Sequence, residues 1–207
     1  MHLLFILYLP KTFERPGVRI LLLYYLTSQI NLTMFRILVI ALLTIPNLGH
    51  AQIKELDPFL QDELYRWENA RKYTLAVLHA MPEAQYTFKP TPEEMDFRNQ
   101  AAHLADNILW LTSKFVSKET APLSVNSFQG TTKAQLIDLV MQTFDYGAEG
   151  FRNLDPLRLA EEIDFAGQKM SRRRIIFLIN DHLTHHRAQM IVYLRLQGIT
   201  PPKYVGW

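Results

Sequence analysis

The sequence predicts an all-α protein, a four-helix bundle preceded by an apolar N-terminal leader over residues 1–51. From residue 52 onward apolar side chains recur every three and four positions, the period of a helix with one buried face. No run in that part shows the strict alternation of a half-buried strand. The 207 residues, 48% of them hydrophobic, suffice for one domain with its own core. We therefore assign the bundle domain to 52–207.

The last part of the leader, 34–51, has the three parts of a secretory signal peptide. A positive charge at Arg36 precedes a short apolar core, and small residues precede a cleavage point after Ala51. Residues 1–33 then read as upstream sequence in the same frame, with Met34 as the true start. This pattern predicts an exported protein, periplasmic or secreted.

The alternative is a leader that stays attached as a membrane anchor. Its two apolar pieces, 18–26 and 35–45, would then lie in the bilayer. Each piece is shorter than the roughly 20 apolar residues that span a bilayer, which favours the signal peptide.

The first two helices have recognisable ends. The first is expected over 57–81, because Asp57 can cap a helix, Pro58 suits the first helical position and Pro82 cannot continue it. The second is expected over 97–117, after a polar stretch that contains prolines.

The last two helices are bounded in the same way. The third is expected over 132–152 and begins with a capping box at Thr132. A charged loop follows, with a short strand or turn near 162–167. The fourth helix is expected over 171–197 and stops at Gly198, a common residue just past a helix end.

Charge and cysteine content exclude several classes of function. The leader holds four of the 22 basic residues and one of the 20 acidic ones, so the remainder carries 18 against 19, a net charge of −1. Such a surface lacks the basic footprint of a nucleic-acid-binding protein, so no nucleic-acid partner is expected. The absence of cysteine excludes a disulfide scaffold and a thiolate metal site. Any metal must be held by histidines and carboxylates.

Three histidines are candidates for such a site. His182 and His186 are four residues apart and lie on one face of the fourth helix, while His103 faces inward on the second. Three imidazoles from two helices would leave a coordination position open, as in catalytic zinc sites. His185 is expected at the surface or in support of a ligand, and His79 lies near the C-terminal end of the first helix, where a cation suits the helix dipole. The spacing alone leaves two alternatives, a metal site or histidines hydrogen-bonded in the core.

Other side chains near these histidines are candidates for supporting functions. Asp106 ranks before Asp181 as the carboxylate that orients a ligand imidazole. Asp106 and Tyr193 are also the candidates for a catalytic group. Trp67 and Trp110 stand on apolar stripes and are expected in the core or in a pocket wall.

Several of these residues together resemble a known family. His103, the segment 182–187 with Gln189, and the tail 193–202 are similar to the DinB-like (YfiT-type) metalloenzymes. The resemblance covers essentially 52–207. Members of that family are mostly cytoplasmic, and the predicted leader sets this chain apart from them.

The resemblance implies a fold and a metal site. The fold is a four-helix bundle with up-down-down-up topology, and the metal is a divalent ion, usually zinc or nickel. Transferred position by position, the ligands are His103, His182 and His186. Family members include thiol-dependent S-transferases and proteins described as hydrolases.

Three hypotheses for function follow. The first is an exported metal-dependent enzyme, a hydrolase or a thiol S-transferase, in which a water or thiol occupies the open position and the partner is a small molecule. The second is a bundle that binds metal or a small ligand without catalysis. The third is a purely structural bundle. A homodimer is compatible with all three.

Overall fold

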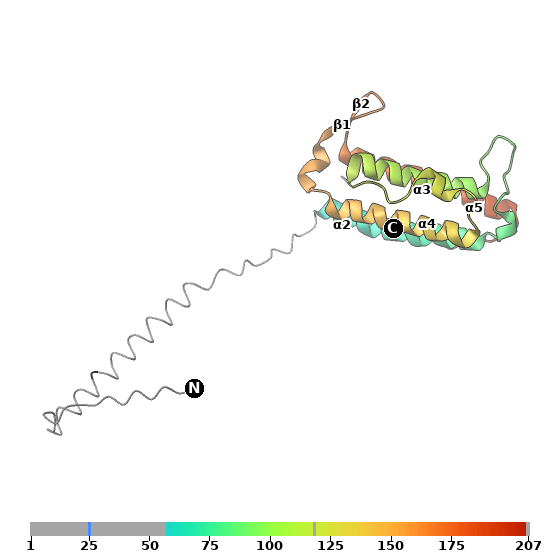
Figure 1. The fold of residues 1–207 in the computed structure, drawn as a ribbon. Coiled ribbons are helices and arrows are strands. Elements are labelled where there is room, and N and C mark those ends of the chain that lie inside the picture. Colours follow the sequence, from blue (N-terminus) through green and yellow to red (C-terminus); the bar gives the residue numbers. More distant parts are fainter. Residues whose placement is uncertain (1–24, 26–56, 118, 206–207) are drawn as a thin grey trace, which may run out of the picture. The chain divides into compact units, whose positions relative to one another are not determined.

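The computed structural model describes residues 25, 57–117 and 119–205. Four α-helices form a bundle: α2 (Pro58–Ala80), α3 (Phe97–Leu111), α4 (Lys133–Asn153) and α5 (Arg172–Leu196) (Figure 1). The predicted fold class is thereby confirmed. Apart from Tyr25, the leader over 1–51 and its signal peptide at 34–51 lie outside the described residues.

The helices begin where side chains can accept hydrogen bonds from their first free backbone N–H groups. The Asp57 carboxylate accepts from the amide of Phe59 at 3.0 Å, and Asp96 accepts from Asn99 at 2.7 Å. Thr132 forms both halves of the predicted capping box at the start of α4. Three helices match their predicted bounds within one residue. The exception is α3, whose last predicted turn is a π-helix.

Contacts at the helix ends establish the topology. Arg98, at the start of α3, donates to Thr131, just before α4, so α3 and α4 run parallel. Lys133, at the start of α4, donates to the carbonyl of Met81 at 2.7 Å, just after α2, so these two helices are antiparallel. The segment between α3 and α4 therefore travels the length of the bundle, as Figure 1 shows. Tyr193, near the end of α5, donates to the carbonyl of Met95, just before α3, so α5 is antiparallel to α3 and the order is up-down-down-up.

A β-hairpin stands before α5. Strands β1 (Glu162–Phe165) and β2 (Gln168–Ser171) pair antiparallel around a turn at Ala166 and Gly167, both with positive φ. The predicted strand or turn is thus a complete hairpin. Phe165 packs against Phe115, with ring centroids 5.5 Å apart, and so fixes the hairpin to the π-helix (Thr112–Val116) that follows α3.

In the core, α2 and α4 approach closely where Trp67 packs against Gly147. The indole N–H of Trp67 donates to the carbonyl of Phe144 at 2.8 Å, and its ring also contacts Phe151. Gly147 leaves room for this ring. Trp110, in contrast, is 45% exposed, so the expectation of a core position was wrong for this residue.

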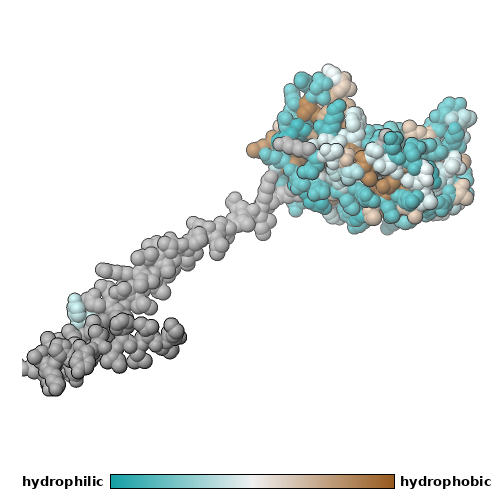
Figure 2. All heavy atoms as spheres, in the orientation of Figure 1, coloured by the Kyte–Doolittle hydropathy of each residue, from teal (hydrophilic) through white to brown (hydrophobic). Residues whose placement is uncertain are grey.

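The visible surface of the bundle is mainly hydrophilic, with small hydrophobic patches (Figure 2). Among the described helices, none has an apolar stretch long enough to cross a membrane.

Candidate metal centre

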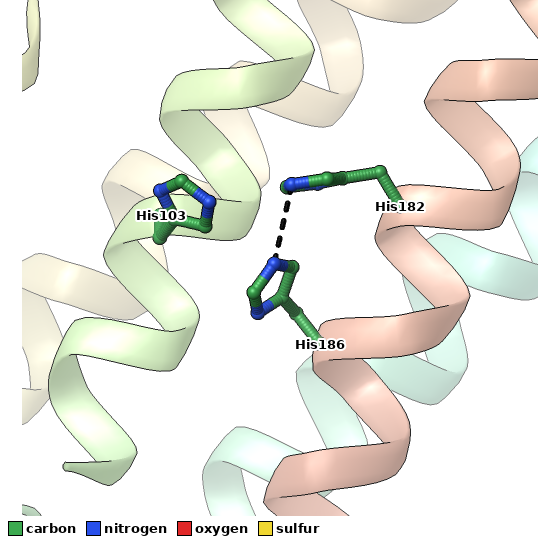
Figure 3. A group of neighbouring side chains, drawn as sticks. All are labelled: His103, His182 and His186. Carbon is green, nitrogen blue, oxygen red and sulfur yellow. Dashed lines mark hydrogen bonds between the residues drawn. The ribbon is translucent and has the colours of Figure 1, made fainter. Parts of the chain in front are cut away.

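Three histidine side chains meet between α3 and α5. His103 projects from α3, and His182 and His186 project from successive turns of α5 (Figure 3). One ring nitrogen from each lies within 4.8 Å of the others. The Nε2 atoms of His182 and His186 are 3.2 Å apart. The structure thus brings together the three residues that the sequence singled out.

The histidine cluster is buried on the side of His186 and partly exposed to solvent on the side of His103 and His182. His186 is 7% exposed, whereas His103 and His182 are half-buried. A cavity of about 270 Å³ is lined by His103 but by neither His182 nor His186. Its lining consists of side chains from α3 and the loops beside it: Met95, Asn99, Ala102, His103, Asp106 and Gln129. A small molecule in this cavity would touch His103 directly.

Burial keeps two of the rings neutral. Removal from water, together with the neighbouring His103 and His185, lowers the pKa of His182 to about 4. The pKa of His186 is lowered to about 4 for the same reasons. A histidine ring must be neutral to bind a metal through one of its nitrogens. Both rings meet this condition at neutral pH.

A chain of hydrogen bonds supports His186 from behind. Its Nδ1 lies 2.6 Å from Oε1 of Gln100, which is 3% exposed. The Gln100 amide donates to the hydroxyl of Tyr193 at 3.2 Å, and that hydroxyl donates to the carbonyl of Met95 at 2.9 Å. Metal-binding histidines commonly have such a partner on the second ring nitrogen.

This arrangement differs from the sequence-based expectation in two respects. Gln100, rather than Asp106, contacts the second nitrogen of a ligand imidazole. Asp106 lines the cavity instead. Tyr193 is 1% exposed and lies behind His186, and it is not among the side chains that line the cavity. Asp181 is exposed.

His182 has no equivalent support among the described residues. Its Nδ1 is buried and has no hydrogen-bond partner there. The side-chain oxygen of Asn107, four residues after His103 on α3, is also buried and without a partner in the described part of the chain. His185 and His79 are exposed, as expected.

The donor set fits a divalent transition metal. Imidazole nitrogens suit zinc and nickel, whereas magnesium and calcium prefer oxygen ligands. Two nitrogens bound tetrahedrally to zinc at about 2.0–2.1 Å lie about 3.3 Å apart. The 3.2 Å between the Nε2 atoms of His182 and His186 agrees with this value.

Comparison with protein families and curated proteins gave two matches. The family model described as the DinB superfamily matches residues 66–190, more than half of the chain and a range that includes all three histidines. The uncharacterized protein YrdA of Bacillus subtilis (strain 168) is 27% identical over 153 residues. That alignment covers 73% of this chain and 88% of YrdA.

Solved structures show the same fold. The DinB-like protein YjoA of Bacillus subtilis is 22% identical with a TM-score of 0.57, and the match covers 69% of this chain and 96% of YjoA. A DinB-like protein from Bacillus cereus is 20% identical with a TM-score of 0.56. That match covers 70% of this chain and 97% of the other. At these identities the likeness concerns the fold.

Proposed function

This protein belongs to the DinB superfamily, and from that premise we propose that it binds one divalent metal ion, zinc or nickel, through His103, His182 and His186. The observation that carries the proposal is the meeting of three imidazoles, from two helices, with ring nitrogens within 4.8 Å of one another. In a purely structural bundle each buried ring nitrogen would be expected to have a hydrogen-bond partner. The orphaned Nδ1 of His182 argues against that purely structural alternative.

We further propose that the metal site is catalytic and acts on a small molecule. A divalent metal held by His103, His182 and His186 would supply Lewis acidity and would lower the pKa of a bound water or thiol. The cavity beside His103 offers the space for a substrate. Asp106 lies one helical turn after His103 and lines the same cavity, where its carboxylate can accept a proton. The reaction class is hydrolysis or thiol S-transfer.

Metal content tests the first proposal. The chain from Gln52 to Trp207, purified without a histidine tag, is expected to hold about one zinc or nickel ion per chain, measured by elemental analysis after reconstitution. His103→Ala and His182→Ala should each lose the ion, because only two imidazoles would be left to bind it. His185→Ala is the matched control, since this exposed histidine is on the same helix as two ligands.

The outcomes separate the hypotheses. Retention of metal in both ligand variants would place the ion elsewhere and contradict the proposal. A protein that binds metal at this site but turns over neither esters and amides nor thiol acceptors would be the non-catalytic binding bundle.

Asp106→Asn distinguishes the two reaction classes. Hydrolysis requires a group that takes a proton from water, so loss of this carboxylate should lower kcat by about 10²–10⁴-fold. A thiol ionises more readily than water and depends less on a base. If the enzyme is a thiol transferase, Asp106→Asn should retain most of its activity. Steady-state kinetics with metal-loaded protein measure the difference, and metal content confirms that the site is intact.

We also propose that the protein is exported, on the strength of the sequence pattern at 34–51. The N-terminal residue of the mature product should then be Gln52. N-terminal sequencing of protein from the extracytoplasmic fraction measures this directly. A product that begins at Met1 would contradict the signal peptide, and a product that begins at Met34 in the membrane fraction would indicate a retained anchor.

A further inference from the structure

The hydrogen-bond chain behind His186 ends at a backbone carbonyl, a group that can only accept a hydrogen bond. The carbonyl oxygen of Met95 can accept a hydrogen bond and cannot donate one. The hydroxyl of Tyr193, 2.9 Å away, must therefore direct its single hydrogen to Met95. Its lone pairs are then left for its other partner, Gln100.

The remaining orientations follow in sequence. Because the Tyr193 hydroxyl accepts from Gln100, the amide presents its NH₂ group to Tyr193 and its oxygen to His186. An amide oxygen can only accept, so Nδ1 of His186 must carry the hydrogen of the bond at 2.6 Å. A neutral imidazole has one such hydrogen, and Nε2 is left with a free lone pair.

We propose that Tyr193 and Gln100 are positioning residues that fix the hydrogen of His186 on Nδ1 and thereby keep Nε2 ready to bind the metal. The effect of this tautomer on metal affinity rests on the function proposed above. The tautomer itself is a property of the metal-free protein. The hydroxyl of Tyr193 acts through Gln100 and does not touch the site.

The two α5 ligands are consequently unequal. With the hydrogen of His186 on Nδ1, its Nε2 can only accept, so in the metal-free protein His182 donates from its own Nε2 across 3.2 Å. Metal binding requires His182 to move this hydrogen to Nδ1. That atom has no hydrogen-bond partner among the described residues, so no existing hydrogen bond has to break. His186 already has the tautomer that metal binding requires, whereas His182 has to change its tautomer.

Removal of the Tyr193 hydroxyl should release the amide. In Tyr193→Phe, Gln100 can rotate by half a turn and present its NH₂ group to Nδ1 of His186. That nitrogen must then accept, and the hydrogen moves to Nε2, where it competes with the metal. Gln100→Leu removes the acceptor altogether and leaves Nδ1 of His186 buried without a partner.

The experiment measures tautomers and metal affinity in parallel. Nitrogen-15 NMR of the metal-free chain from Gln52 to Trp207 at pH 8 reports which ring nitrogen carries the hydrogen. We expect Nδ1–H for His186 and Nε2–H for His182 in the parent. Tyr193→Phe should populate Nε2–H at His186, and its zinc Kd should rise about tenfold or more, within the 10–100-fold range for such supporting groups. Gln100→Leu should weaken zinc binding at least as much.

Two further variants separate this role from a structural one. Tyr86→Phe is the matched control, because Tyr86 is fully buried and its hydroxyl also donates to a backbone carbonyl, that of Leu78 at 2.7 Å. It should change neither tautomer nor zinc Kd. Adding Gln100→Glu to Tyr193→Phe should restore Nδ1–H at His186, because an ionised carboxylate accepts from either side and cannot present a donor.

The outcomes are distinct. Nε2–H at His186 in the parent protein overturns the proposal regardless of the variants. So does a Tyr193→Phe protein with the parental tautomer and zinc Kd. If the parent binds no zinc, the proposed function fails, while the tautomers of the metal-free proteins still decide the present inference.

Discussion

Gly147 lies in α4 directly against the indole of Trp67. A methyl group added at Gly147 would stand 2.5 Å from a ring carbon of Trp67, closer than side-chain carbons approach. The ring has little freedom to retreat, because its N–H is bonded to the carbonyl of Phe144 at 2.8 Å. The glycine is needed here for close approach between α2 and α4.

Gly147→Ala should therefore destabilise the protein. Glycine to alanine within a helix usually gains about 1 kcal/mol, but overpacking costs about 1–3 kcal/mol, so the free energy of unfolding should fall by up to about 2 kcal/mol. Urea denaturation measures the change. Glu149→Ala, two residues on and exposed, should stay within about 0.5 kcal/mol of the parent. A Gly147→Ala protein more stable than the parent would show that Trp67 moves aside.

At the same scale, the sequence identified the three histidines and missed the residue that supports them. The spacing of His182 and His186 is a local property that any helix converts into proximity. The contact between Gln100 and His186 spans 86 residues and depends on the alignment of α3 against α5. The available signal was a glutamine on the apolar face of a predicted helix, one turn before His103. Asp106 was ranked first from the sequence only because Asp181 was expected to face solvent.

Arg172 connects several elements at the start of α5. Its guanidinium donates twice to the carboxylate of Glu161, at 2.9 and 3.1 Å, and also to the carbonyl of Phe115 in the π-helix that follows α3. Arg158, in the short helix before the hairpin, donates to the same carboxylate at 2.9 Å. Hydrogen bonds from Arg172 and then Arg158 lower the pKa of Glu161 to about 2. This ion pair holds the segment between α4 and α5 against the bundle.

The lowered pKa predicts a pH dependence of stability. A carboxyl whose pKa is lower in the folded state stabilises the protein above the unfolded pKa, and that contribution disappears as pH falls through the folded value. The stability difference between the parent and Glu161→Gln should be largest above about pH 5 and should vanish between 4.5 and about 2. Thermal unfolding across this range measures it. Glu162→Gln, at an exposed neighbour, should follow the parental profile, and a pH-independent difference for Glu161→Gln would contradict the assignment.

Element boundaries were predictable wherever a local side chain sets them. The caps at Asp57 and Thr132 need only residues two or three positions away, so their helices begin where expected. The hairpin was predicted only as a strand or turn, because its strands have four residues each and are stabilised by packing of Phe165 on Phe115. The π-turn at Thr112–Val116 had no recognisable sequence signal.

For the whole molecule, the histidine cluster joins two helices that are distant in sequence. α3 supplies His103 and α5 supplies His182 and His186, the proposed ligands. A metal bound by both helices favours the folded state only, since the unfolded chain holds the same ligands apart. The up-down-down-up order itself came from the family resemblance, because hydrophobic periodicity does not specify how helices are connected.

Metal removal should therefore lower the melting temperature. At a free zinc concentration 100 times Kd, binding adds about 2.7 kcal/mol to the free energy of unfolding. For a domain of this size that corresponds to a rise in Tm of about 5–10 °C. Calorimetry with zinc and with a chelator measures the shift. His186→Ala should show none, and an equal shift in that variant would mean that zinc stabilises the fold from another site.

Met95 belongs both to the hydrogen-bond chain behind His186 and to the lining of the cavity beside His103. Its carbonyl terminates the hydrogen-bond chain behind His186, and the residue lines the cavity beside His103. A ligand that displaces Met95 on entering the cavity would release the Tyr193 hydroxyl and change the affinity for the metal. Thermodynamic reciprocity then requires the metal to change the affinity for that ligand by the same factor. Occupancy of the cavity and of the metal centre would be coupled through a single backbone carbonyl.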